Sequence, residues 1–118
     1  MDPTIINPEA LERLEEWGGA DLVQKMVSLF LENSPERLEQ IRAAFADDPG
    51  SLPERGSHSL KSSAANVGAV QVREVCALIE HASSEEDWAR VRELVPQLES
   101  AYAEVVEALE STQQGNSE

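Results

Sequence analysis

The chain has 118 residues, 23 of them acidic and nine basic, so its formal net charge at pH 7 is −14. Apolar residues make up 41% and aromatic residues only 4%, a composition that allows one domain with a modest aliphatic core. The negative charge disfavours nucleic acids and anionic membranes as partners, because proteins bind both through Lys and Arg.

The first predicted helix begins at Asn7 and stops at Gly18 and Gly19. Asn7 is a suitable cap, Pro8 suits the first helical position, and the double glycine ends the pattern. Its apolar face is predicted to consist of Leu11, Leu14 and Trp17.

A longer helical segment is predicted from Asp21 to about Asp47. Pro35 interrupts it, but the apolar stripe keeps its phase across the proline, which favours a kinked helix over two separate helices. The stripe that we expect to be buried comprises Leu22, Met26, Leu29, Phe30, Leu38, Ile41 and Phe45.

Three further helices complete the expected fold. One runs from near Pro53 to about Gly68. The next runs from about Ala69 to Ala82, with Val72, Cys76 and Ile79 facing inward. The last is expected to be capped by Ser83 or Ser84, with three acidic residues in its first turn. Its inward positions alternate in steps of three and four, as in a helix packed along antiparallel neighbours. These positions are Trp88, Val91, Val95, Leu98, Tyr102, Val105 and Leu109.

No segment has the pattern of a β-strand. The sequence therefore predicts an all-α fold, an antiparallel four-helix bundle with a short additional N-terminal helix. Residues 1–111 form the single domain, and residues 112–118 form a polar C-terminal tail.

The charge distribution is uneven around one histidine. No Asp or Glu occurs from Arg55 to Arg73, where the average density would place about four. On a helix, His58, Lys61, Ser62 and Ala65 share one side, which has no large apolar group and is expected to be open. The opposite side would pack inward through Leu60, Ser63, Ala64 and Val67.

An exposed neutral imidazole is a nucleophile through a ring nitrogen, since an unperturbed histidine has a pKa near 6.5. If His58 attacked a phosphoryl group, Lys61 could support the transferring oxygens, and small neighbours would leave room for a bulky partner. An ordinary surface histidine is the competing interpretation of the same residues. A hydrolase with His58 as general base is a poorer one, because no partner side chain is identifiable.

The stretches "HSLKSSAANVGA" and "VREVCALIEHAS" resemble the histidine-containing phosphotransfer (HPt) domain of bacterial phosphorelays. The shared pattern is a His, an apolar residue two later, a Lys three later, small residues and Gly-Ala, followed by Cys-x-x-apolar-Glu. The likeness extends in outline over residues 7–111. The matching positions here are His58, Leu60, Lys61, Ser62, Ser63, Ala64, Gly68, Ala69, Cys76, Ile79 and Glu80.

The resemblance implies a phosphorelay intermediate. His58 would accept a phosphoryl group from the aspartyl-phosphate of one receiver domain and pass it to another, with Lys61 steadying it. In some members a glutamine of the next helix holds the inner ring nitrogen. Glu80 falls at that position, where a carboxylate would orient the ring, but a solvent-facing or helix-pairing Glu80 is the favoured expectation. No cofactor and no metal site are expected, since the Mg²⁺ that the transfer needs belongs to the receiver domain.

The implied partners are receiver domains of response regulators and a hybrid sensor histidine kinase, bound by a monomer. Arg55, Ser62, Ala65 and Gly68 are expected to contribute to the docking surface around His58. The chain has no glycine-rich phosphate loop, so it would carry phosphohistidine without kinase activity of its own. A docking module that binds a receiver or kinase domain without passing phosphate on is the alternative function.

A cytoplasmic location is expected. No apolar run reaches the roughly 18 residues of a membrane span, and no secretory signal is visible. Cys76 is the sole cysteine, which fits a reducing compartment, and its apolar neighbours predict a buried thiol.

Overall fold

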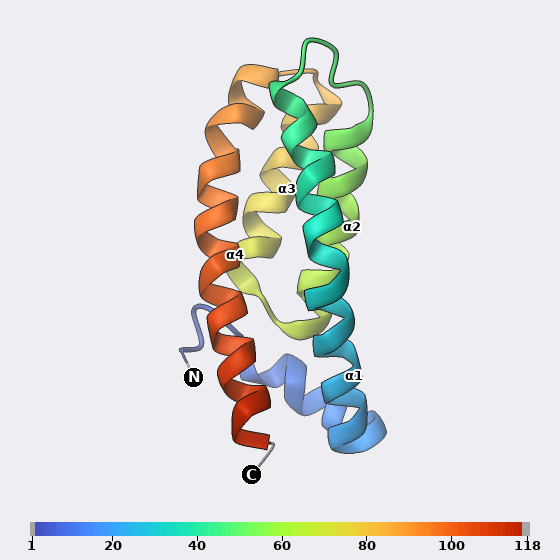
Figure 1. The fold of residues 1–118 in the computed structure, drawn as a ribbon, viewed down its shortest axis with the longest axis vertical. Coiled ribbons are helices and arrows are strands. Elements are labelled where there is room, and N and C mark those ends of the chain that lie inside the picture. The colour runs from blue at the N-terminus through green and yellow to red at the C-terminus, as the bar shows by residue number, and fades with distance from the viewer. Residues whose placement is uncertain (1, 117–118) are drawn as a thin grey trace.

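The computed structural model describes residues 2–116, with side chains to residue 111, and within that range it is an all-α bundle. The elements are α1 (Pro8–Arg42), the 3₁₀ turn η1 (Ala43–Phe45), α2 (Leu52–Val67), α3 (Val70–Ser84) and α4 (Trp88–Asn116). Consecutive helices run in opposite directions (Figure 1). The predicted antiparallel bundle is therefore confirmed. Helix α4 continues to Asn116, into the segment expected to be a tail, and residues 117 and 118 lie outside the described range.

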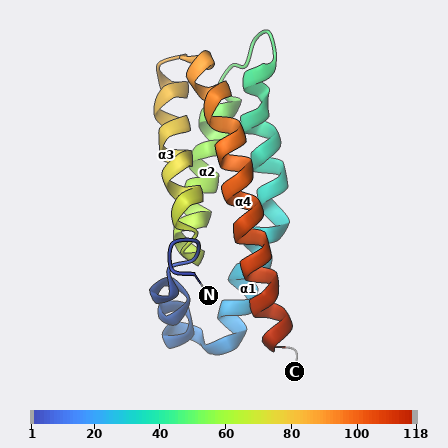
Figure 2. The ribbon, with the colours of Figure 1, turned by 90° about the vertical axis from the view of Figure 1, so that its left-hand side faces the viewer.

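Helix α1 contains the short predicted segment and the long one as far as Arg42; the long segment was predicted to reach about Asp47, but beyond Arg42 the chain forms η1. Asn7 caps it by accepting a hydrogen bond from the Glu9 amide at 3.1 Å, and Pro8 occupies the first position. The helix breaks at Gly19, whose φ of 72° and ψ of −170° are not helical, so the predicted stop is confirmed. The segment before Gly19 crosses one end of the bundle, as Figure 2 shows. Pro35 lies inside the long segment, which continues through it as one helix.

The turn between α3 and α4 differs from the prediction. Ser83 and Ser84 still belong to α3, and Asp87 caps α4 by accepting a hydrogen bond from the Arg90 amide at 3.2 Å. The residue before Asp87, Glu86, has a positive φ of 57° and lies in the turn. The acidic residues expected in the first turn of α4 therefore lie just before that helix. Their carboxylates are still at its positive end, which explains why the sequence suggested an earlier start.

The core lies between all four helices and is mainly aliphatic. Val, Leu, Ile and Ala side chains fill it, and Phe30 packs against Tyr102 with ring centroids 6.0 Å apart. The largest side chains that are fully buried include Ile6, Ile41, Leu60, Ile79, Leu94, Leu98 and Leu109. Helical periodicity thus identified the inward faces of α2, α3 and α4 correctly.

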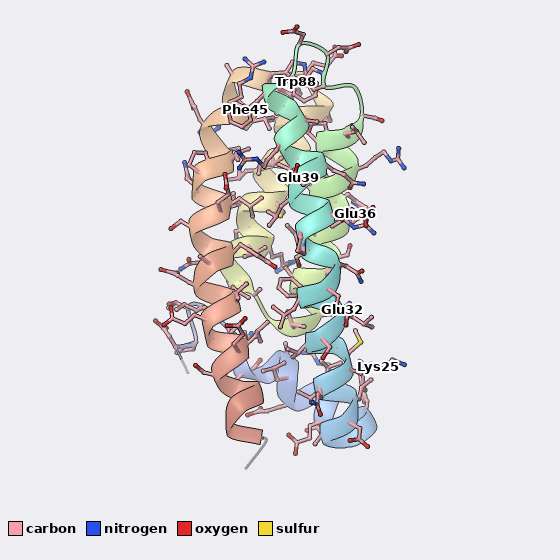
Figure 3. The ribbon with its side chains drawn as sticks, in the orientation of Figure 1. Lys25, Glu32, Glu36, Glu39, Phe45 and Trp88 are labelled. Carbon is pink, nitrogen blue, oxygen red and sulfur yellow. The ribbon has the colours of Figure 1, made fainter. Side chains whose placement is uncertain are left out.

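Two aromatic residues that were predicted to be buried are exposed. Trp17 is 72% exposed. The buried residues of the segment before Gly19 are Ala10 and Leu14, so this segment packs against the bundle through these two side chains and not through Trp17. Phe45 is 56% exposed, because it lies in η1, where the tighter 3₁₀ winding places Ala44 in the buried position. Phe45 and Trp88 lie at the same end of the bundle (Figure 3).

Two glycines permit close approaches of the backbone. A Cβ at Gly56 would lie 2.8 Å from the Arg37 carbonyl oxygen, so glycine lets α2 pack tightly against α1. Gly68 ends α2 with φ 76°, and a Cβ there would lie 2.6 Å from the Asn7 carbonyl oxygen. The Asn7 amide donates to the Gly68 carbonyl at 2.8 Å, which fixes the N-terminal segment to the connection between α2 and α3.

The outward face of α1 is acidic. Figure 3 shows Glu32, Glu36 and Glu39 along this side of the helix, with Lys25 nearer its N-terminal half, and all four residues are exposed. Over the described part of the chain, none of the helices has both the length and the apolar character needed to cross a membrane.

Candidate functional site

His58 lies on the outer face of α2, six residues after the start of the helix at Leu52. Its neighbours on the inner face, Leu60 and Ala64, are fully buried and fix the rotation of the helix. The His58 side chain remains 64% exposed. The imidazole is therefore accessible to another protein, as the helical pattern predicted.

Glu80, on the neighbouring helix α3, holds the inner nitrogen of this ring. Its Oε2 lies 2.5 Å from His58 Nδ1. Ile79 and Cys76 are buried on the inner side of α3, so Glu80 is turned toward α2. The sequence favoured a solvent-facing or helix-pairing Glu80 over one that orients the ring, whereas the structure places the carboxylate in contact with His58.

The same carboxylate accepts a second hydrogen bond. Lys61 Nζ donates to Glu80 Oε1 at 2.5 Å, and both side chains are less than one-third exposed. The pKa of Glu80 is lowered, first by the hydrogen bond from Lys61 and then by that from His58, against the opposing effect of desolvation. Glu80 is accordingly ionised at neutral pH.

The protonation of the ring follows from this contact. An ionised carboxylate can only accept hydrogen bonds, so Nδ1 carries the proton in the bonded ring. In the neutral imidazole, Nε2 then keeps its lone pair. The arrangement presents a nucleophilic nitrogen on an exposed helix face, with an ammonium group one turn away on the same helix.

The second histidine, His81, is arranged differently. It is 75% exposed, but its outer nitrogen Nε2 lies 3.2 Å from Glu85 Oε1. The outer nitrogen of His81, which an incoming group would reach, is therefore already in contact with a carboxylate. At His58 that nitrogen is free of protein contacts within the described residues.

The absence of acidic residues around His58 in the sequence does not extend to three dimensions. Glu80 comes from outside the Arg55–Arg73 stretch and reaches the ring from α3. Its charge is balanced by Lys61, so this cluster of three side chains is neutral when His58 is neutral. The expectation that carboxylates are kept away from His58 holds only within the Arg55–Arg73 stretch, since Glu54 lies one turn before His58 on α2.

The four residues predicted for the docking surface separate into two groups. Arg55, Ser62 and Ala65 are exposed on the same side of α2 as His58, and Ser62 Oγ donates to the His58 carbonyl at 3.3 Å. Gly68 is buried under the N-terminal segment. The structure thus corrects the assignment of Gly68, whose part is to allow the left-handed turn and the close packing of residue 7.

A hollow between α1 and α2 adds residues that the sequence did not identify. It begins about one turn beyond His58 and is lined by Met26, Leu29, Phe30, Asn33, Ser63, Asn66 and Val67. Leu29 had been predicted to be part of the buried stripe, yet it is 39% exposed. Only the relative rotation of α1 and α2 brings Leu29 beside Asn66, so no pattern within a single helix could reveal this surface.

Cys76 lies beneath the site but is not part of its exposed surface. Burial raises the pKa of the Cys76 thiol to about 12, so it is a neutral core residue, as predicted. Over the described residues, no three His, Cys, Asp or Glu side chains gather closely enough to hold a metal ion.

The family model for the Hpt domain matches residues 25–114. Among solved structures, the chain is similar to histidine-containing phosphotransfer protein B (HptB) from Pseudomonas aeruginosa PAO1. The TM-score is 0.88 and the identity 24%, with 96% of this chain and 97% of that chain covered. No curated protein matches the sequence.

Proposed function

This chain belongs to the Hpt domain family, and we propose that the protein is a phosphorelay intermediate. It carries the phosphoryl group on Nε2 of His58, in keeping with the role of the family in histidine phosphotransfer. The donor is the aspartyl-phosphate of one receiver domain and the acceptor is the aspartate of another. The observation that carries the proposal is the contact between His58 Nδ1 and Glu80 Oε2 at 2.5 Å, on a ring that is 64% exposed. It leaves Nε2 as the nucleophile and turns it toward a partner.

Two neighbouring side chains have distinct parts in this proposal. Glu80 orients the ring and keeps the proton on Nδ1, so no separate base is needed to activate Nε2. Lys61 uses one of its three N–H donors on Glu80, and the others are available to the phosphoryl oxygens. Support of this kind matters because charge on the transferring phosphoryl group is spread over its oxygens.

The receiver domain is proposed to dock on the outer face of α2 and the hollow beside it. Arg55, Ser62 and Ala65 surround His58 with small or cationic groups, which admit a phosphorylated partner. Leu29 and Met26 supply apolar area at the edge of α1. The Mg²⁺ required for the reaction comes with the receiver.

The test is phosphoryl transfer from a phosphorylated receiver domain to the wild type and to two variants. His58→Gln removes the proposed acceptor, and His81→Gln is the matched control, because His81 is also exposed and also contacts a carboxylate. We expect acid-labile, base-stable phosphate on the wild type and on His81→Gln, and none on His58→Gln. Label that persists in His58→Gln would contradict the proposal.

The alternative, a docking module without transfer, predicts a different result. In that case the receiver would bind the wild type and His58→Gln with equal affinity, and mass spectrometry at neutral pH would find no phosphohistidine in either.

A further inference from the structure

The proton on Nδ1 of His58, which faces Glu80, affects both steps of phosphoryl transfer. In loading, the Nε2 lone pair forms a bond to phosphorus, while the bond from phosphorus to the aspartate oxygen breaks and its electron pair leaves with the carboxylate. No proton moves in this step. The product is a phosphorylated ring that retains its Nδ1 proton and carries a formal positive charge.

Unloading reverses these changes at a second receiver. An aspartate oxygen bonds to phosphorus, the Nε2–P bond breaks, and its electron pair returns to the ring. If Nδ1 still holds its proton, the leaving group is neutral imidazole. If Nδ1 has lost it, the leaving group is an imidazolate anion, which is far more basic and leaves much more slowly.

We infer that Glu80, through its contact with Nδ1, retains the proton on the phosphorylated ring and so keeps phosphohistidine ready for transfer as the pH rises. This inference rests on the proposed function and concerns the regulation of the same site by pH. The supporting geometry is the 2.5 Å separation of His58 Nδ1 and Glu80 Oε2, from a carboxylate that is held in place by Lys61 on its other oxygen. An opposite charge in contact with a group favours its charged form, and here that form is the protonated ring.

Other charged groups near the ring do not provide such a contact. Among the described residues, Glu80 is the charged residue that contacts the ring. The remaining charged residues on the adjoining helix turns are Glu54, Arg55 and Lys61 on α2, His81 on α3, and Glu36, Arg37 and Glu39 on the turn of α1 that packs against Gly56. Lys61 and Arg55 are cations that oppose a positive ring, so the retention of the proton depends on Glu80. Glu80 is a positioning residue in this scheme, because it acts through His58 and not on the phosphoryl group.

The experiment uses the full chain with ¹⁵N-labelled histidine, phosphorylated on His58 by phosphoramidate, a small donor that needs no docking surface. The ¹⁵N shift of Nδ1 is followed from neutral to alkaline pH in the wild type and in Glu80→Gln, which keeps the shape and an acceptor oxygen but removes the charge. We expect Glu80→Gln to lose the Nδ1 proton about one pH unit lower, at the low end of the effect of a contacting charge because the ring is exposed. Transfer to a receiver should decline at correspondingly lower pH.

Four further variants separate the contact from general electrostatics. Glu54→Gln makes the same charge change one turn before His58 and should shift the titration much less than Glu80→Gln does, because the contact with Nδ1 comes from Glu80. Glu80→Asp retains the charge on a shorter side chain and should fall between the wild type and Glu80→Gln. Glu80→Gln also frees Lys61 from its hydrogen bond. The titrations of Lys61→Met and Lys61→Met/Glu80→Gln should therefore differ by the same amount as those of the wild type and Glu80→Gln, which excludes the freed Lys61 as the cause of the shift.

The outcomes distinguish this inference from the function on which it rests. Coincident titrations of wild type and Glu80→Gln, or a shift that vanishes in the Lys61→Met background, would overturn the inference alone. A phosphorylated wild type that passes no phosphate to any receiver at any pH would overturn the proposed function.

Discussion

Replacement of Gly56 by alanine sets two effects of opposite sign against each other at a site two residues before His58. Alanine in a helix interior is favoured over glycine by about 1 kcal/mol. The new Cβ, however, would lie 2.8 Å from both the Arg37 carbonyl oxygen and Gln40 Cβ. A backbone carbonyl cannot rotate away, so α2 must move off α1.

The steric effect is the larger one. Overpacking of this kind costs about 1–3 kcal/mol, and two simultaneous contacts, one of them with backbone, place Gly56→Ala in the upper part of that range. After the gain in helix propensity we expect a net loss of roughly 1–2 kcal/mol. With an unfolding entropy of about 2.1 cal/mol/K per residue over 118 residues, the melting temperature should fall by roughly 4–8 °C.

Thermal and urea unfolding followed by circular dichroism measure this loss directly. Ala65→Gly is the matched control, because Ala65 is exposed on the same helix and the substitution isolates the propensity term. That control should lose about 1 kcal/mol. If Gly56→Ala melts at or above the wild-type temperature, propensity outweighs packing, and the close approach of α2 to α1 is not a determinant of stability.

Three further outcomes follow from the structure. Gly68→Ala should destabilise the fold more than Gly56→Ala does, because it combines a φ of 76° with a Cβ that would lie 2.6 Å from the Asn7 carbonyl oxygen. Unfolding in urea measures the loss of stability, and a loss equal to or smaller than that of Gly56→Ala would mean that the N-terminal segment moves aside easily. Lys61→Met should slow loading of His58 by a phosphorylated receiver roughly tenfold, as expected for a partly exposed charge-assisted hydrogen bond, and Lys61→Arg should recover part of the rate; equal rates in all three proteins would exclude a role in transfer. The Cys76 thiol, whose pKa is raised to about 12 by burial, should react with a disulfide reagent at mildly alkaline pH only as fast as the protein unfolds, whereas rapid reaction of the native protein would contradict its burial.

Much of the fold follows from local patterns in the sequence. Helical spacing placed Leu60, Ile79 and Leu98 inside correctly, because each lies in the middle of a helix whose phase is set by several residues. The break at Gly19 and the cap at Asn7 were also predictable, since each depends on the chemistry of neighbouring residues. Predictions were wrong at helix ends: Phe45 and Trp17 depend on how a 3₁₀ turn or a short crossing segment leaves the bundle.

The candidate site was predictable in part for the same reason. The open face that carries His58 and Lys61 is a property of one helix, so its spacing was sufficient. The contact with Glu80 depends on the register between α2 and α3, and the meaning of Gly56 depends on how closely α1 and α2 approach. By helix propensity alone Gly56 is a weak point in α2, whereas in three dimensions it allows a close approach of α2 to α1.

The order of the helices also bears on how the site forms. His58, Lys61 and Glu80 all belong to one helical hairpin, α2 and α3, joined only by Gly68 and Ala69. Interactions between residues close in sequence require little loop closure and are typical of chains that fold within microseconds to milliseconds. The reactive cluster therefore needs only the register of this one hairpin for its mutual contacts.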